Sequence, residues 1–209
     1  MRLRNVKGAK WIIESSNYVV LDYKEHRGKY SKLFGNDNSI YIEIGMGKGQ
    51  FIINNALKYP DINFIGIEKY DSVVVRAIQK LEDKDIPNLK IIRMDALEID
   101  DVFDHEISKI YLNFSDPWPK DRHAHRRLSS EIFLKKYDSI FRGNKNITMK
   151  TDNRKLFEYS VKSFVDYGYK INDISLDLHN DIYLDNIMTE YEERFVSKGN
   201  QIYMVDVYK

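Results

Sequence analysis

The sequence predicts an α/β domain built on a mostly parallel sheet. From residue 39 onward, short apolar runs alternate with longer segments whose apolar residues recur at helical spacing. Parallel neighbours need a crossover connection, which helices of this length provide, whereas antiparallel neighbours can be joined by a tight turn. We therefore expect a Rossmann-like arrangement with helices on both faces of the sheet.

Strands and helices are expected in alternation up to residue 165, followed by a strand pair. The strands are expected in SIYIEIG (39–45), INFIGIE (62–68), LKIIRMD (89–95), KIYLNFSD (109–116) and NITMKTD (146–152). The helices are expected in QFIINNALKY (50–59), SVVVRAIQKLED (72–83) and EIFLKKYDSIF (131–141). A fourth helix is expected after the fifth strand, because five apolar residues fall on one helical face: Leu156, Phe157, Val161, Phe164 and Val165. In the tail, YKINDISLDL (169–178) and QIYMVDVYK (201–209) alternate without a comparably clear helix between them, which predicts an antiparallel pair at one edge.

Length and composition indicate one domain spanning 1–209, with a basic N-terminal arm and helical extension over 1–38. Of the 209 residues, 43% are hydrophobic and 31% are charged. No run reaches the roughly 18 apolar residues of a membrane helix, and no apolar stretch of signal-peptide length follows the basic start, so we expect a cytoplasmic protein without a membrane partner. The absence of cysteine excludes disulfides and thiolate chemistry.

The net charge of +1 conceals segregated charges. Arg2, Arg4, Lys7 and Lys10 have no acid among them, whereas the stretches 95–106 and 173–193 are acidic. A polyanion would therefore have to meet the protein on one side, although a solvated surface is the simpler explanation for such a pattern.

The segment EIGMGKG (43–49) forms a glycine turn between the first strand and the first helix. Its spacing is G-x-G-x-G, and Gln50 stands at the position where a dinucleotide site would have its third glycine. The turn resembles the first motif of class I S-adenosylmethionine-dependent methyltransferases. That cofactor has a sulfonium and an ammonium but no phosphate. The carboxylate of Glu43 therefore suits it, whereas the same carboxylate would repel the pyrophosphate of a dinucleotide. A structural loop, and an NAD-dependent oxidoreductase in which Glu68 binds the ribose, remain alternatives.

Acids cluster at the carboxyl ends of the five predicted parallel strands, which is where such sheets bind ligands. They are Glu43, Glu68, Asp95, Asp116 and Asp152. We expect Glu68 to accept from both ribose hydroxyls and Asp95 from the adenine amino group.

The segment SDPWPKDRHAHRRLSS (115–130) follows the fourth strand. Pro117 and Pro119 predict a stiff, extended loop around Trp118 that cannot join the sheet. The basic run RHAHRR suits phosphates and stacking on bases. We expect no metal site there, because the chain has no cysteine, no third ligand is evident and the lysines and arginines repel cations. A loop that only covers the core with Trp118 is the alternative.

Taken together, EIGMGKG, IGIE, SDPWPK followed by RHAHRR, KTDN and TEYEERF resemble the bacterial tRNA (guanine-N7)-methyltransferases. The motifs occur in order from Glu43 to Phe195, and the length is similar. The resemblance implies a class I fold, S-adenosylmethionine as methyl donor, and methylation of guanine N7 at position 46 of the tRNA variable loop.

The resemblance also implies roles for individual residues. The cofactor contacts would be Glu43, Gly45, Gly47, Gly49, Glu68, Asp95 and Asp116, with Asp116 also the catalytic residue. The substrate contacts would be Lys120, Asp152, Thr189, Glu190, Tyr191 and Glu192. The RNA contacts would be Arg122, His123, Ala124, His125, Arg126 and Arg127. Asp121 and His125 depart from the family, which often has lysines there, and this weakens the expected RNA contact.

The chemistry of guanine limits what these residues would do. N7 carries no proton, so attack on the methyl group needs no general base, and Asp116 would stabilise the growing positive charge. Asp152 or Glu192 could accept from the N1–H and N2–H₂ edge; a helix N-cap after KTDN and a solvated acidic loop at TEYEERF are the alternatives. A non-catalytic RNA-binding module on a relic fold also remains possible, and the sequence leaves monomer or homodimer undecided.

Overall fold

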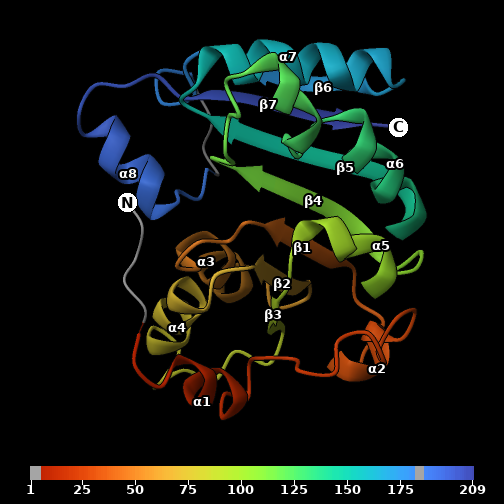
Figure 1. The fold of residues 1–209 in the computed structure, drawn as a ribbon, viewed down its shortest axis with the longest axis vertical. Helices are drawn as coiled ribbons and strands as arrows, with labels where there is room; N and C mark the ends of the chain where they lie inside the picture. Colours follow the sequence, from red (N-terminus) through yellow and green to blue (C-terminus); the bar gives the residue numbers. More distant parts are fainter. Residues whose placement is uncertain (1–5, 182–185) are drawn as a thin grey trace.

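The computed structural model describes residues 6–181 and 186–209, so Arg2 and Arg4 of the basic arm lie outside the described residues. The strands of the sheet are β1 (Ile40–Ile44), β2 (Asn63–Glu68), β3 (Leu89–Arg93), β4 (Ile107–Asn113), β5 (Phe141–Thr151), β6 (Lys170–Ser175) and β7 (Tyr203–Tyr208). They form one sheet in the order β3-β2-β1-β4-β5-β7-β6 (Figure 1). The first five strands are parallel, and β7 is antiparallel to both of its neighbours. The predicted mostly parallel sheet with an antiparallel C-terminal pair is confirmed.

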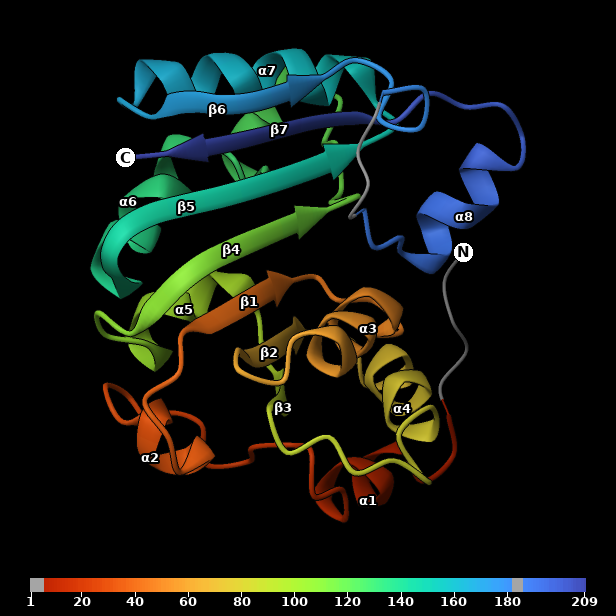
Figure 2. The ribbon, with the colours of Figure 1, turned by 180° about the vertical axis from the view of Figure 1, so that it is seen from behind.

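The helices connect these strands. They are α1 (Ala9–Glu14), α2 (Tyr30–Phe34), α3 (Gln50–Lys58), α4 (Asp71–Gln79), α5 (Ile99–Val102), α6 (Glu131–Ile140), α7 (Arg154–Asp166) and α8 (Glu190–Val196), with 3-10 turns η1 (Ala96–Glu98) and η2 (Asp121–Arg126). The arrowheads of β1, β4 and β5 point towards the end of the sheet where α8 lies (Figure 2). The glycine turn after β1 therefore lies beside the point between β1 and β4 where the strand order reverses, which is the usual ligand site of such sheets.

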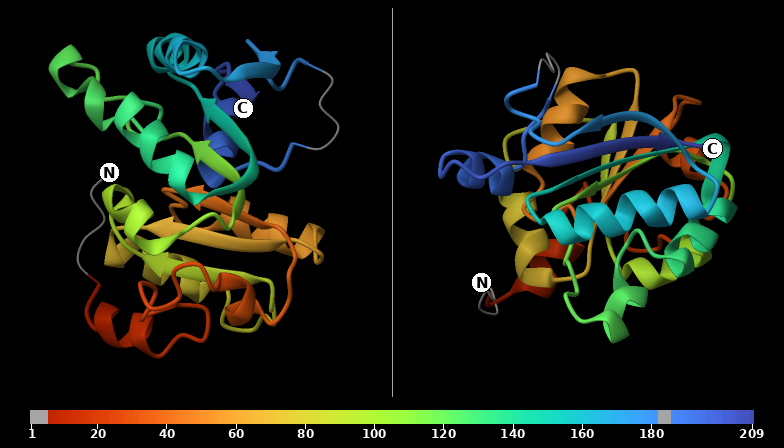
Figure 3. Two further views of the ribbon diagram at one scale, coloured as in Figure 1. Left: turned by 90° about the vertical axis from the view of Figure 1, so that its right-hand side faces the viewer. Right: turned by 90° about the horizontal axis from the view of Figure 1, so that it is seen from above.

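The two faces of the sheet carry separate cores, with α6 and α3 on opposite sides (Figure 3). One face packs against α5, α6 and α7, with Leu134 and Phe164 fully buried. The other face packs against α1, α3 and α4, with Ile52 and Val74 fully buried. Helices on both faces explain why the strands read as continuous apolar runs rather than alternating ones.

Three details differ from the expected elements. The strand expected from residue 146 begins earlier, at Phe141, as β5. Residues 142–145 interrupt its register with β4, and because they are mostly polar the sequence pattern did not reveal this part of the strand. Val165 is 49% exposed, so it does not join the buried face of α7. The tail contains α8 between its two strands.

The N-cap of α7 is Asn153, whose side chain accepts a hydrogen bond of 2.9 Å from the Leu156 amide. The alternative that Asp152 is only a helix cap is therefore wrong, and its carboxylate is left to act elsewhere. Among the described helices, none is both long and apolar enough to cross a membrane.

Candidate functional site

The glycine turn is held by the end of the neighbouring strand. Gly45, Gly47 and Gly49 all have positive φ, between 58° and 79°, which only glycine adopts without strain. The Gly45 and Met46 amides both donate to the Ile67 carbonyl at 2.9 Å. A Cβ at Gly49 would lie 3.1 Å from that of Ala77 in α4, so this glycine also allows α3 and α4 to pack. A Cβ at Gly45 or Gly47 would meet nothing within 4 Å, so the space beside these two glycines is open.

Glu68 closes the turn from β2. Its carboxylate accepts from the Gly47 amide at 3.2 Å and from the Lys69 and Tyr70 amides at 2.8 and 3.1 Å. Burial raises the pKa of Glu68, and these amides oppose the rise. The result is a preorganised acceptor at the mouth of the turn.

Asp95 follows β3 and lies beside the same turn. It accepts from the Leu97 amide at 3.0 Å, and its other oxygen is 3.2 Å from Lys69 Nζ. Burial would raise the pKa of Asp95, but the Leu97 amide and Lys69 outweigh it and lower the pKa. Asp95 is therefore an ionised acceptor, as its expected contact with an amino group requires.

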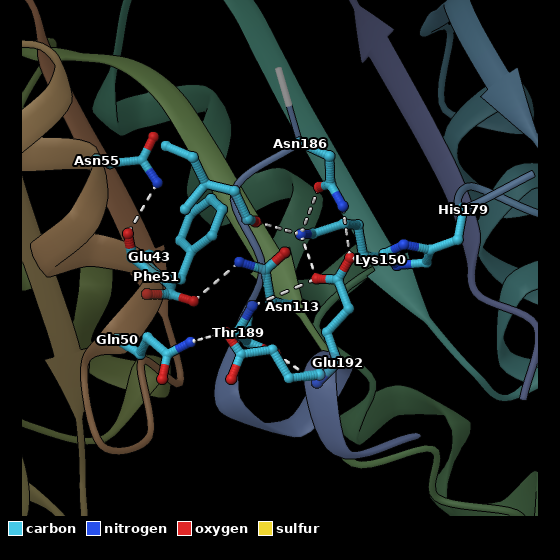
Figure 4. Close-up of polar contacts among 12 residues, drawn as sticks. Glu43, Gln50, Phe51, Asn55, Asn113, Lys150, His179, Asn186, Thr189 and Glu192 are labelled. Atoms are coloured by element: carbon cyan, nitrogen blue, oxygen red, sulfur yellow. Dashed lines mark hydrogen bonds and ion pairs between the residues drawn. The ribbon is translucent and has the colours of Figure 1, made fainter. Parts of the chain in front are cut away.

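Glu43 lies in the core of the site, only 1% exposed. Its Oε1 accepts from Asn113 Nδ2 at 2.8 Å (Figure 4), while burial raises the pKa of Glu43 to about 8 against the opposing effects of Asn113 and Lys150. Neither Glu43 Oε2 nor Asn113 Oδ1 has a hydrogen-bond partner among residues 6–181 and 186–209. Such buried, unsatisfied acceptors are costly unless a ligand or water supplies a donor.

The loop after β4 is strained and internally braced. Phe114 and Trp118 have φ of 51° and 42°, which is rare outside glycine. Arg127 is 8% exposed, and its guanidinium donates to the carbonyls of Pro117 and Trp118, both at 3.0 Å. Arg127 thus supports the loop from inside, and its expected contact with RNA stays a prediction.

The rest of the basic segment faces outward. Lys120, Arg122, His125 and Arg126 are exposed, while His123 and Ala124 are partly buried. The Arg126 guanidinium lies 4.9 Å from the Trp118 ring centroid, and the His123 ring meets the Trp118 ring edge-on. The Trp118 ring therefore packs against Arg126 and His123 of the basic segment, and it does more than cover the core.

Asp116 lies at the start of this loop and is exposed, with no hydrogen bond from the described residues. Lys69 is near enough that Asp116 contributes to the raised pKa of that lysine, after the larger effects of Asp95. The structure thus brings Asp116 towards the same edge as Asp95. Its carboxylate remains available to a ligand.

The TEYE segment opens α8 rather than forming an acidic loop. Thr189 Oγ1 accepts from the Glu192 amide at 2.9 Å, and Glu192 Oε2 accepts from the Thr189 amide at 3.4 Å, which is a capping box. The Thr-x-x-Glu spacing is the sequence signal that would have predicted this helix. Tyr191 donates to Asp152 Oδ2 at 3.3 Å and stacks on Phe195, with ring centroids 4.1 Å apart.

Acidic residues of α8 reach the glycine turn and its flanking helices. Glu190 pairs with Lys80 at 2.6 Å and with Lys48 at 3.6 Å. Glu193 accepts from Gln50 Nε2 at 2.6 Å. The substrate segment and the cofactor segment expected from the sequence therefore meet in space.

The sequence reasoning missed the residue that holds α8 to the sheet. Lys150 of β5 is 4% exposed, and its Nζ lies 2.6 Å from Glu192 Oε2 (Figure 4). Burial lowers the pKa of Lys150, and Glu192 opposes this. A lysine inside an apolar strand was the available signal, since a buried lysine needs a partner.

The comparisons with known proteins agree on the class. A family model described as "Putative methyltransferase" matches residues 37–205. A curated protein of Lachnoclostridium phytofermentans, named tRNA (guanine-N(7)-)-methyltransferase, is 50% identical over 211 residues, covering 100% of this chain and 99% of the relative. A protein of the same name from Bacillus licheniformis is 49% identical over 208 residues, covering 99% of this chain and 98% of the relative.

Solved structures show the fold at low sequence identity. An antibiotic-related methyltransferase has a TM-score of 0.65 at 15% identity, covering 87% of this chain and 92% of its own. A mutant 16S rRNA (adenine(1408)-N(1))-methyltransferase from Catenulisporales acidiphilia, solved with its cosubstrate SAM, has a TM-score of 0.61 at 14% identity, covering 90% of this chain and 92% of its own.

The fold and the arrangement of the glycine turn and strand-end acids thus define a Rossmann-like methyltransferase. The identity with curated relatives over the full length is more specific. The chain belongs to the tRNA (guanine-N7)-methyltransferase family.

The residues present fit S-adenosylmethionine. Space is open beside Gly45 and Gly47, and Glu43 and Asn113 hold unsatisfied buried acceptors for a donor such as an ammonium group. Among the described residues, no group of three or more His, Asp or Glu side chains could hold a metal ion.

Proposed function

We propose that this protein transfers a methyl group from S-adenosylmethionine to N7 of guanine 46 in the variable loop of tRNA. The observation that carries the proposal is the 50% identity, over the full chain, to a relative named for this activity. The geometry supports it independently. A glycine turn with buried acceptors lies beside an exposed carboxylate, Asp116, and a basic loop, Lys120 to Arg126.

The cofactor would be held by the N-terminal half of the sheet. Bound S-adenosylmethionine supplies a methyl group that its sulfonium makes electrophilic. Glu68, already fixed by three amides, would accept from the ribose hydroxyls, and ionised Asp95 from the adenine amino group. Glu43 would face the positively charged end, where a cation would favour its ionised form.

The chain needs no general base, because guanine N7 has a free lone pair and no proton. Asp116 would stabilise positive charge as it grows on the base, which is the kind of electrostatic effect that preorganised groups supply best. The remaining acceleration would come from holding the base in line, which can supply about 7–11 kcal/mol of a barrier.

Guanine would be recognised by acceptors at the carboxyl ends of β4 and β5. Asp152 is partly exposed and takes one hydrogen bond, from Tyr191, so it can accept from the N1–H and N2–H₂ edge. Thr189, Glu190 and Tyr191 would complete this side. Glu192, fully buried, has both oxygens engaged within the protein.

The RNA backbone would meet the exposed cations after the proline loop. Lys120, Arg122 and Arg126 are exposed and adjacent, which suits phosphates. The target should be a loop or a splayed base, because the major groove of A-form RNA is too narrow for side chains to reach N7.

The test is methylation of an unmodified tRNA transcript. The protein is incubated with the transcript and labelled S-adenosylmethionine, and the RNA is digested and read by mass spectrometry. We expect 7-methylguanosine at position 46, and none in a matched transcript that has adenine there. Label at another position, or no label with folded protein, would overturn the proposal.

Thermal unfolding distinguishes the proposed methyltransferase from the two alternatives, an NAD-dependent oxidoreductase and a non-catalytic RNA-binding module. A ligand that binds only the folded state raises the melting temperature by an amount that grows with the ratio of its concentration to its Kd. We expect stabilisation by S-adenosylmethionine and none by NAD. Binding of tRNA without stabilisation by S-adenosylmethionine would instead indicate a non-catalytic RNA-binding module.

A further inference from the structure

A buried ammonium group joins the sheet to the substrate segment. Lys150 Nζ lies 2.6 Å from Glu192 Oε2, 2.9 Å from the Ile187 carbonyl and 3.1 Å from Asn186 Oδ1 (Figure 4). All three acceptors belong to the short stretch 186–192, and the donor belongs to β5, near the carboxyl end of that strand. A single cation therefore fixes both the approach to α8 and its first turn.

We propose that Lys150 is a positioning residue for methyl transfer: it sets the place of α8 over the glycine turn, with Glu192 as its counter-ion. This inference rests on the proposed function. It assigns Lys150 no contact with substrate. Its role is to act through Thr189 and Tyr191.

The environment of Glu192 supports an anchoring role. Oε1 accepts from Asn186 Nδ2 at 2.7 Å and lies 3.0 Å from His179 Nε2, while Oε2 accepts from Lys150 and the Thr189 amide. The residue is 0% exposed. A guanine edge could reach this carboxylate only after these bonds were broken, so its contacts serve the helix rather than the base.

The opposite side of α8 explains why its position matters for the reaction. Glu190 and Glu193 bind residues of the cofactor turn and its flanking helices. Tyr191 between them reaches Asp152 and lies with its ring centroid 4.9 Å from that of Phe114. A shift of α8 would therefore move Tyr191 relative to both the cofactor turn and Asp152.

A buried ion pair alone would be weak support, because such pairs can often be replaced by apolar residues without loss of stability. This ion pair differs from an isolated one because the segment 186–192 places three acceptors around the single ammonium group of Lys150. Removing the Glu192 charge together with the Lys150 charge would still leave the Ile187 carbonyl and Asn186 without their donor.

The first experiment separates positioning from stability. We expect Lys150→Met to lower kcat about 10²-fold, since a misplacement of about 1 Å can cost that much, while the Kd for S-adenosylmethionine changes by a much smaller factor. The double variant K150M/E192M should recover the melting temperature only in part, because the Ile187 carbonyl and Asn186 stay without their donor, and it should not recover kcat. Recovery of kcat together with the melting temperature would contradict the proposal, because the pair would then be only structural.

The second experiment uses a cavity of about 460 Å³ that Lys150 lines together with Asn186, Ile187 and residues of β4, β5 and β7. In Lys150→Ala the missing group has the size of propylammonium. We expect added n-propylammonium to restore kcat in a saturable manner, and n-propanol, which has the same size but no charge, to have no effect. Equal effects of the two additives would overturn the proposal.

Lys145→Met is the matched control, because Lys145 lies on the same strand, pairs with Asp138 and is only one quarter exposed. It should leave kcat and KM unchanged. A kcat loss equal to that of Lys150→Met would contradict the assignment. If the wild-type protein methylates no tRNA, the proposed function fails; if it is active while Lys150→Met retains full kcat, only the present inference fails.

Discussion

The two halves of the site are built by different kinds of contact. On the cofactor side, formed by the glycine turn and the acids after β2 and β3, most partners are close in sequence. Glu68 and Asp95 accept from backbone amides one or two residues further along the chain. The exceptions are the Gly47 amide, which binds Glu68, and the Lys69 side chain, which binds Asp95. On the substrate side, the contacts join distant segments: Lys150 and Glu192 are 42 residues apart, and Gln50 and Glu193 are 143 apart. Local contacts can be read from a motif, whereas distant ones require the fold.

The difference also appears in the charges. On the cofactor side, the buried carboxylate Glu43 has one oxygen without a hydrogen-bond partner among the described residues, whereas the substrate side neutralises its buried carboxylate, Glu192, with Lys150. A cationic ligand is therefore favoured at the first half. The second half is arranged to fix a helix in place.

The largest expected effect comes from Asp116, which lies between the two halves. We expect Asp116→Ala to lower kcat by about 10²–10³-fold, the range measured when one preorganised electrostatic group is removed. Because Asp116 is exposed and bonded to no described residue, the melting temperature should not change. Asp121→Ala, which removes an exposed acid from the same segment, is the control and should retain kcat.

The buried carboxyl group of Glu43 should make the free energy of unfolding depend on pH. Its pKa is raised to about 8, so the folded state holds the proton that the unfolded state releases above its lower pKa. The contribution to stability is therefore present at low pH and is lost as the pH rises towards 8, at about 1.4 kcal/mol per pH unit.

We expect Glu43→Gln, which cannot ionise, to escape this loss. The measurement is the free energy of unfolding of both proteins without cofactor between pH 5 and pH 8.5. The advantage of the variant over wild type should grow with pH and level off above 8. A difference that is constant across this range would show that Glu43 does not hold a proton when folded.

Two neighbouring arginines give a smaller effect on the RNA side. Arg126 is exposed, whereas the buried Arg127 supports the loop carbonyls. Arg126→Ala should weaken tRNA binding and reduce the slope of log K against log salt by about 0.7–0.9 for one lost phosphate contact. Arg127→Ala should lower the melting temperature and change the slope less than Arg126→Ala does. The reverse pattern would show that the two residues are assigned the wrong way round.

The fold could be predicted in most of its elements because the five parallel strands and their crossover helices have strong, regular patterns. The glycine turn and Glu68 were likewise predictable, since a motif fixes residues close in sequence. The start of β5 and the helix α8 were not predicted. In both cases polar residues obscured an element that tertiary contacts stabilise. The Thr-x-x-Glu capping signal at Thr189 was not used: the segment was expected to contact substrate, with an acidic loop as the alternative.

Lys150 and Asn113 show the limit of sequence reasoning most clearly. Each lies in a predicted strand, but the partners that give it a role, Glu192 and Glu43, come from segments whose relative placement only the folded sheet determines. Arg127 shows the converse. Its basic motif predicted a contact with RNA, but not the hydrogen bonds by which it supports the loop, which go to carbonyls ten and nine residues away.

The most direct test of this division is a pair of dissociation constants measured by titration calorimetry on two variants, Glu68→Gln and Lys120→Ala. Glu68 belongs to the cofactor turn and Lys120 to the exposed basic loop. We expect Glu68→Gln to raise the Kd for S-adenosylmethionine and leave the Kd for tRNA unchanged, and Lys120→Ala to do the opposite. If either variant weakened both ligands equally, the site would not be divided in this way.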